Sequence, residues 1–339
     1  MCHIRLASLS AVQRQGQVDN RDDRGNQRIH QTRRRLTTSS LQPPEVIFSN
    51  NHLLVVNKTP GWKSQPGEGS GSSSGAVDPK CLLTYLQKQG LGGGSQNDFL
   101  TPTHRLDQPC SGVLIFAKNG KAASRVQVAW SKRQIEKCYW VVVEGGNSLN
   151  KSKLGGLELL QNRSSQLSDG SFRLSAIVNS KKATDGGRGS VSVKPVPPSM
   201  NSAGNSKPHS KDRGTDGRLC HIEWKHLKRL PDTEYSTTRH LLSVKTDTGA
   251  KHQVRALLAI AGGAPIAGDL RYGNNVLRIN QDGGRVQKPL RDQSVALHAR
   301  SVYLPTVSLG SMEFMKEEPF IAAIPKCWKD LFGIAEHGW

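Results

Sequence analysis

Three short segments of the sequence combine charged or hydrogen-bonding side chains with apolar neighbours. The first runs from Thr103 to Gly112 and leads directly into the apolar residues 113–117. A loop that enters a buried strand lies at the edge of the core, and partial desolvation there strengthens a carboxylate such as Asp107 as a nucleophile or base. An aspartate before Pro-x-Ser-Gly is also typical of an Asx turn, which is the simpler interpretation of this segment taken alone.

The second segment runs from Gln134 to Trp140 and leads into a stretch rich in β-branched and aromatic residues. Tyr139 would begin a strand there, with Lys137 just before it. From that position the ring of Tyr139 could face a cleft and stack on a nucleic-acid base. A tyrosine packed in the core beside a sheet fits the same pattern.

The third segment, Thr248 to Arg255, is a Thr-Gly turn followed by a short helix. Its first turn carries Lys251, His252 and Arg255. A helix N-terminus favours anions, so an arginine near it is locally unfavourable. A carboxylate partner would explain Arg255, and a solvated side chain is the other interpretation.

The surrounding elements should hold these segments on a sheet. Short strands alternate with few long helices, so the predicted fold class is α+β, with a mixed, largely antiparallel sheet and flanking helices. The predicted strands are 46–48, 53–58, 113–117, 138–144, 219–227 and 240–244. The predicted helices begin at Asp78-Pro79, at Asn119 (through about Arg133) and at Gln253 (through Ile260), the last stopped by Gly262-Gly263.

Two segments are too polar to build a core. Residues 1–44 carry eight arginines and three aspartates, which is typical of an organelle presequence or of a disordered basic arm. Residues 147–217 are mostly Ser, Gly, Lys, Asn and Pro, and we expect a disordered insertion at about 185–218. We expect a mitochondrial or plastid location if residues 1–44 are a presequence, and the cytoplasm or nucleus otherwise.

Composition narrows the class of partner. The formal net charge is +20, from 47 Lys and Arg against 27 Asp and Glu, which indicates a polyanion such as nucleic acid. No apolar run approaches the length that spans a bilayer, so we do not expect a membrane protein. The six cysteines lack CxxC spacing and suggest neither a zinc ribbon nor a disulfide scaffold; they are Cys2, Cys81, Cys110, Cys138, Cys220 and Cys327.

Taken together, the motifs resemble those of the RluA-type pseudouridine synthases, over about residues 45–335. Six segments match in the family's order, a stronger signal than any one of them. They are Val46 to Gly61 with its Lys58-Thr59-Pro60-Gly61 turn, His104-Arg105-Leu106-Asp107 with Ser111-Gly112, Lys137-x-Tyr139 with Gly145, Thr248 to Arg255, Gly268-Asp269-x-x-Tyr272-Gly273, and Leu297-His298-Ala299.

The resemblance implies a catalytic domain over 45–335 that isomerises specific uridines in structured RNA (rRNA, tRNA or organelle RNA). It makes Asp107 the catalytic aspartate, Tyr139 the aromatic residue beside the target base, and Arg255 the cation that pairs with Asp107. It implies no cofactor and no metal, and we expect a monomer. The residues expected to contact the RNA are His104, Arg105, Lys137, Lys251, His252 and Gln253.

Two positions depart from the family pattern: Ala250 stands where an arginine is usual, and Leu257 where many members have histidine. Both could alter the grip on RNA. The main alternative is a catalytically idle RNA-binding or ribosome-assembly factor on the same fold, which would have no need to keep Asp107, Tyr139 and Arg255 together. A glycosidase would require a second acidic residue close to Asp107, and the sequence places none nearby.

Overall fold

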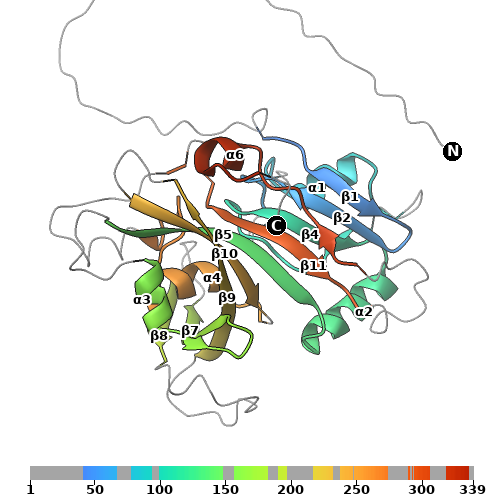
Figure 1. The fold of residues 1–339 in the computed structure, drawn as a ribbon. Coiled ribbons are helices and arrows are strands. Elements are labelled where there is room, and N and C mark those ends of the chain that lie inside the picture. The colour runs from blue at the N-terminus through green and yellow to red at the C-terminus, as the bar shows by residue number, and fades with distance from the viewer. Residues whose placement is uncertain are drawn as a thin grey trace, which may run out of the picture. The chain divides into compact units, whose positions relative to one another are not determined.

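The described strands form one twelve-stranded sheet. In the computed structural model, residues 41–66, 78–93, 99–147, 156–181, 190–196, 217–231, 237–246, 248–273, 289–290, 292, 294–305 and 318–335 are described, and all belong to the unit Thr37–Trp339. Within them the main strand order is β1-β2-β4-β11-β5-β10-β9-β7-β6, with β3, β8 and β12 paired beside it (Figure 1). The pairing of β4 with β11 is parallel and the other named pairings are antiparallel, which confirms the mixed, largely antiparallel sheet.

The elements have the following bounds. The strands are β1 Glu45–Ser49, β2 Leu53–Lys58, β3 Thr101–Pro102, β4 Ser111–Ala117, β5 Glu136–Asn147, β6 Ser165–Gln166, β7 Phe172–Lys181, β8 Ser190–Pro195, β9 Arg218–Leu230, β10 Thr237–Thr246, β11 Leu297–Tyr303 and β12 Phe320–Ile321. The helices are α1 Leu82–Lys88, α2 Gly120–Ser131, α3 Leu157–Asn162, α4 Gln253–Ala256, the π-helix η3 Leu257–Ala261, and α6 Cys327–Phe332.

Strand β4 shows why its sequence is an unbroken apolar run. All seven of its residues are buried. Successive side chains of a strand point to opposite faces, and here both faces are covered. Leu114 and Phe116 pack in the larger core with α1, whereas Val113 and Ile115 pack in a second core against α2.

Helix α2 follows its predicted limits closely. Asn119 is its N-cap, and the Asn119 side-chain oxygen accepts a hydrogen bond from Ala122 N at 2.9 Å. Helix α1 begins at Leu82, so the prediction of a start at Asp78-Pro79 was wrong. The Asp78 carboxylate instead accepts from Lys80 N and pairs with Lys63, which holds residues 78–81 in a turn before the helix.

The polar stretch after β5 contains more structure than its composition indicated. Residues 156–196 include α3, β6, β7 and β8, and β8 lies inside the range 185–218 predicted as a disordered insertion. Strand β8 pairs with β7, and its Val191 and Val193 pack against Ala256, Ala259 and Tyr272. Residues 185–189 and 197–216 of the predicted insertion lie outside the described residues, as do residues 1–40 of the predicted tail 1–44.

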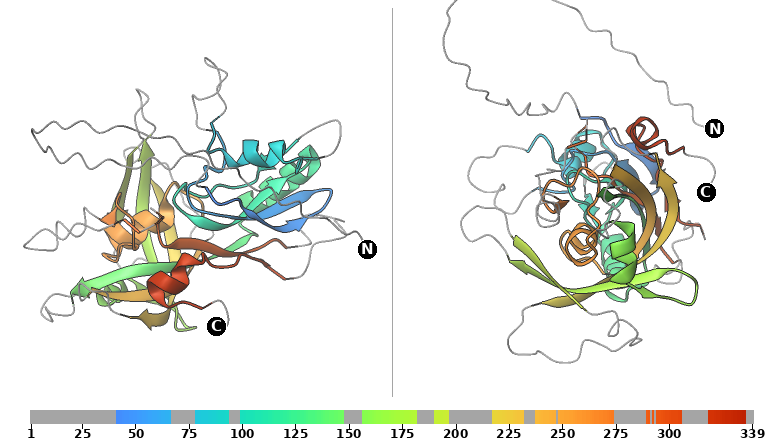
Figure 2. Two further views of the ribbon diagram at one scale, coloured as in Figure 1. Left: turned by 90° about the horizontal axis from the view of Figure 1, so that it is seen from above. Right: turned by 60° about the vertical axis from the view of Figure 1, so that its left-hand side comes forward.

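Helix α4 and the π-helix that continues it cover one side of the sheet. Figure 2 shows them, in orange, on the opposite side from α6, in red. The helix predicted from Gln253 to Ile260 is present, but its second half has the wider π-turn, which often occurs at functional sites. None of the helices within the described ranges is long and apolar enough to cross a membrane.

Gly112 allows β4 to approach β11 closely. Its φ is +113°, and a Cβ at this position would lie 2.3 Å from Ala299 O and 2.5 Å from Ala299 N. Residues with a side chain rarely adopt this conformation, and here there is also no room for one. The glycine therefore brings the loop before β4 beside β11 and β5.

His298 on β11 predicts a dependence of stability on pH. It is fully buried, with Nδ1 2.9 Å from Ser111 Oγ, and burial lowers its pKa from 6.5 to about 4. As the pH falls, His298 is therefore protonated near pH 6.5 in the unfolded chain but only near pH 4 in the folded chain. The free energy of unfolding should fall as pH drops through this window, by on the order of 3 kcal/mol from this residue. Urea denaturation at several pH values measures it. In the control His298→Asn, the slope against pH should be smaller.

Candidate active site

The loop before β4 places Asp107 at the edge of the core, as predicted. Its side chain is 26 % exposed. The oxygen Oδ2 accepts a hydrogen bond from Arg255 Nη1 at 2.8 Å, and Oδ1 lies 3.7 Å from His252 Nε2. The carboxylate partner predicted for Arg255 is therefore present, and it comes from a residue 148 positions away in the sequence.

Arg255 is held by a second carboxylate. Its Nε and Nη2 donate to the two oxygens of Asp269 at 2.7 and 2.9 Å, a bidentate contact that fixes the plane of the guanidinium. Asp269 is fully buried and Arg255 is 5 % exposed. Burial alone would lower the pKa of Arg255, but the hydrogen bonds to Asp269 and the charges of both carboxylates raise it overall. Arg255 thus remains a cation with one nitrogen directed at Asp107.

Lys58 at the end of β2 clamps the backbone of the Asp107 loop. Its Nζ donates to the carbonyl oxygens of Cys110, Gln108 and Asp107 at 2.6, 3.2 and 3.3 Å. The side chain is fully buried, and desolvation lowers the pKa of Lys58 to about 8. Two of these oxygens also accept from backbone N–H groups, Gln108 O from Gly61 and Asp107 O from Cys110. The ammonium group therefore adds to bonds that already hold the loop, and it fixes the backbone on both sides of the carboxylate.

Tyr139 lies on β5, opposite Val244 of β10 and Ala299 of β11. It is 8 % exposed, and burial, followed by the charges of Cys110 and Asp107, raises its pKa. The phenol therefore keeps its proton at neutral pH. Its ring is part of the core and lies near Asp107, and stacking on a base stays a prediction.

The turn before α4 is built around buried side chains. Gln253 Nε2 donates to Thr248 Oγ1 and Thr246 Oγ1 at 2.6 and 2.9 Å, and its Oε1 accepts from Ala250 N. Lys137 Nζ donates to Thr248 O at 3.0 Å. Gln253 and Lys137 are 4 % and 9 % exposed. In this structure both residues shape the turn, and contact with RNA stays a prediction for them.

His104 also has a partner within the protein. Its Nε2 accepts from Ile115 N at 3.2 Å, its ring centroid is 5.1 Å from that of Trp130, and burial lowers its pKa to about 3. Lys137 Nζ lies 5.0 Å from the centroid of the same indole. A neutral, packed imidazole supports the loop that leads to Asp107. By contrast, Arg105 and Lys251 are exposed.

The structure therefore places the nine predicted residues in different surroundings. Asp107, Arg255 and His252 meet directly, with Tyr139 beside them, whereas Gln253 and Lys137 meet at Thr248 and His104 lies at Trp130. Three further residues, to which the sequence assigned no role at the site, help to build it: Lys58, Asp269 and Tyr272. All three stand within the quoted motifs, which is the signal that could have found them.

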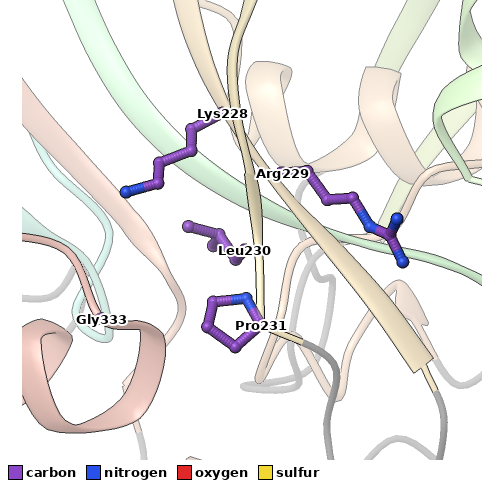
Figure 3. Close-up of a pocket in the computed structure, with 5 residues that line it drawn as sticks. All are labelled: Lys228, Arg229, Leu230, Pro231 and Gly333. Carbon is purple, nitrogen blue, oxygen red and sulfur yellow. The ribbon is translucent and has the colours of Figure 1, made fainter.

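A pocket elsewhere carries no comparable chemistry. Figure 3 shows it at the end of β9, where the side chains of Lys228 and Arg229 point to opposite sides. It lies at the opposite end of β10 from the turn at Thr248, since Leu230 pairs with Arg239. Its lining contains no carboxylate; it consists of Lys228, Arg229, Leu230, Pro231 and Gly333. Among the described residues, no group of three or more His, Cys, Asp or Glu is arranged to hold a metal ion.

A family model described as RNA pseudouridylate synthase matches residues 52–260, a range that contains Asp107, Tyr139 and Arg255. The chain belongs to this family. The membership confirms the resemblance inferred from the six motifs. It makes the protein an RNA-modifying isomerase, an enzyme of the pseudouridine synthase class.

Three named relatives are described as pseudouridine or pseudouridylate synthases, in agreement with the family model. A Zymomonas mobilis protein described as an uncharacterized RNA pseudouridine synthase is 26 % identical over 231 residues, covering 67 % of this chain and 74 % of that protein. The human mitochondrial pseudouridylate synthase RPUSD4 is 24 % identical over 325 residues, covering 90 % of this chain and 73 % of the relative. The ribosomal large subunit pseudouridine synthase C of Rickettsia prowazekii is 24 % identical over 265 residues, covering 78 % and 64 %.

The pairing of Arg255 with Asp269 predicts that Asp269→Asn is damaging despite its nearly unchanged shape. The substitution leaves a buried guanidinium with only Asp107 as its anion, so unfolding free energy should fall by on the order of 3–5 kcal/mol. Pseudouridine formation should fall as well, because Arg255 loses its fixed orientation. Denaturant titration and an activity assay measure both. Glu158→Gln, an exposed position on α3, is the matched control. Wild-type stability of Asp269→Asn would contradict the pairing.

Proposed function

We propose that this synthase isomerises specific uridines of structured RNA (rRNA, tRNA or organelle RNA) with Asp107 as its catalytic carboxylate. The observation that carries the proposal is the Asp107–Arg255 ion pair. One carboxylate oxygen is held by a buried arginine, and the side chain as a whole is 26 % exposed. A carboxylate oriented in this way meets the geometric requirement for attack or proton removal.

The isomerisation of uridine requires one such oriented carboxylate. The N1–C1′ bond breaks, the base rotates, and a C5–C1′ bond forms, so that C5 loses a proton and N1 gains one. Asp107 could add to C6 of the base or to C1′ of the ribose, or promote elimination as a base. Each route uses the Asp107 carboxylate, and the atoms balance without an oxidant or a second substrate.

Residues near Asp107 in the structure or the sequence are suited to bind the target nucleotide. A uridine in a folded RNA must leave its stack to reach Asp107, and an aromatic ring can replace the lost stacking. Tyr139 supplies such a ring beside the carboxylate. Arg105 and Lys251, both exposed, would contact phosphates near the target nucleotide, which agrees with the net charge of +20.

The alternative of a catalytically idle RNA-binding or assembly factor is weaker. A protein that only binds RNA gains nothing from a partly exposed carboxylate held by a buried arginine and a second buried carboxylate. Burying Arg255 and Asp269 costs solvation energy that the protein recovers only through their close contact. We therefore assign the arrangement to catalysis.

Substitution of Asp107 should separate catalysis from binding. We expect Asp107→Asn to lower pseudouridine formation by at least roughly 10³-fold, while the affinity for RNA changes little. Large-subunit rRNA and tRNA transcripts made with [5-³H]UTP provide the assay, because rejoining through C5 releases tritium to water. Gln108→Ala, an exposed neighbour, is the control. Full tritium release by Asp107→Asn would show that another residue performs the chemistry.

The basic tail predicts import. Residues 1–44 have an arginine-rich composition, and the human relative is named mitochondrial. We expect a fluorescent fusion of the full chain to enter mitochondria, and a fusion lacking residues 1–43 to remain outside them. Microscopy of the two fusions in the same cells measures the difference. Import of the shortened fusion would assign the targeting signal to the remaining sequence.

A further inference from the structure

His252 has an unusual backbone conformation at the point closest to Asp107. Its φ is 56° and its ψ is 25°, in the left-handed region, and it is one of only two non-glycine residues with positive φ among the described residues. A residue with a branched or bulky side chain pays on the order of 1 kcal/mol or more for this conformation. The conformation aims the imidazole, whose side chain is 12 % exposed, at the carboxylate.

Tyr272 holds the far side of the imidazole. His252 Nδ1 lies 2.8 Å from Tyr272 Oη, a hydrogen-bond distance. Tyr272 is itself fixed, since it is 4 % exposed, its backbone N donates to Asp269, and its ring lies against the guanidinium of Arg255. Burial raises the pKa of Tyr272, so its hydroxyl keeps the proton that it can donate to Nδ1.

This contact and the carboxylate of Asp107 together favour one tautomer of His252. Desolvation lowers the pKa of His252 to about 4, against the charge of Asp107, and the cations Arg255, Arg271 and Lys251 act in the same direction as desolvation. The ring is neutral at pH 7. When Nδ1 accepts from Tyr272, the proton is on Nε2 and points to Asp107 Oδ1. The other tautomer would set two lone pairs against each other across this gap.

The two oxygens of Asp107 therefore have different neighbours. Oδ2 is bonded to Arg255, whereas Oδ1 lies 3.7 Å from His252 Nε2, beyond hydrogen-bond distance. A catalytic hydrogen bond is often long in the free enzyme and shortens when substrate binds. A shift of less than about 1 Å closes this one.

We propose that His252, held by Tyr272, is a positioning residue that donates its Nε2 proton to Asp107 Oδ1 and directs this oxygen at the target uridine. This rests on the catalytic role proposed for Asp107. A carboxylate held by one hydrogen bond, from Arg255, can still rotate about that bond. A second hydrogen bond from His252, on a different side, would stop this rotation.

Two substitutions separate this role from support of the turn. In His252→Gln the amide nitrogen takes the place of Nε2, so a donor still faces Asp107. In His252→Asn the amide reaches only the place of Nδ1, but asparagine tolerates the left-handed conformation well. If His252 only supports the turn, His252→Asn should be more active than His252→Gln. If His252 positions Asp107, His252→Gln should be the more active variant.

Tritium release from a [5-³H]uridine-labelled transcript that the wild type modifies gives kcat and KM for each variant. We expect His252→Asn to lower kcat by roughly 10- to 100-fold, the value of a hydrogen bond to a charged group, with KM, RNA affinity and melting temperature near the wild type. His252→Gln should recover most of the loss. Adding Tyr272→Phe to His252→Asn should cost little more, because both act through one contact. Wild-type kcat in His252→Asn, or Asn outperforming Gln, would overturn the proposal.

A second measurement does not depend on turnover. The ¹⁵N shifts of the His252 ring in the wild-type protein report its tautomer, and we expect a proton on Nε2 that Tyr272→Phe makes less exclusive. A proton on Nδ1 alone would refute the role of His252. Failure of the proposed function looks different: the wild type would release no tritium from any RNA, while the tautomer remained as described.

Discussion

The site depends on one buried cation. Arg255 lies between Asp269, which binds two of its nitrogens, and Asp107, which binds a third. A guanidinium without partners is costly to bury, so these contacts determine where α4 can lie. Because Asp269 fixes the plane of the guanidinium, the remaining nitrogen has a single direction, and that direction leads to the carboxylate proposed for catalysis.

The rest of the fold brings this trio together from separate places. Asp107 reaches the site because Lys58 clamps its loop and Gly112 lets β4 approach β11. Arg255 reaches it because Gln253 and Lys137 hold the turn between β10 and α4. Most of these supporting groups are buried and satisfied within the protein. Arg105, two residues before Asp107, and Lys251, in the turn before α4, are exposed positive charges of the kind that suits a phosphate backbone.

Prediction from the sequence worked where a pattern had one physical meaning. The apolar run 113–117 could only be a segment covered on both faces, and β4 is covered by two cores. Asn119 could cap a helix, and it does so at α2. The prediction failed at β8, where serines alternate with Val191 and Val193. Such a half-polar edge strand has the composition of a loop, and it is ordered by packing against Ala256 and Tyr272, which no local pattern reveals.

The sequence by itself determined the family and the order of its motifs, and it suggested a carboxylate partner for Arg255 with a solvated side chain as the other interpretation. The suggestion arose because an arginine in the first turn of a helix opposes the helix dipole and favours a compensating charge. Only the tertiary structure decided that Asp269 holds the arginine from behind and that Tyr272 orients His252 toward Asp107. These contacts join residues 14 and 20 positions apart, with the π-helix η3 between them. Spacing of that kind has no fixed geometry, so it is the packing of α4 against the sheet that sets their distances.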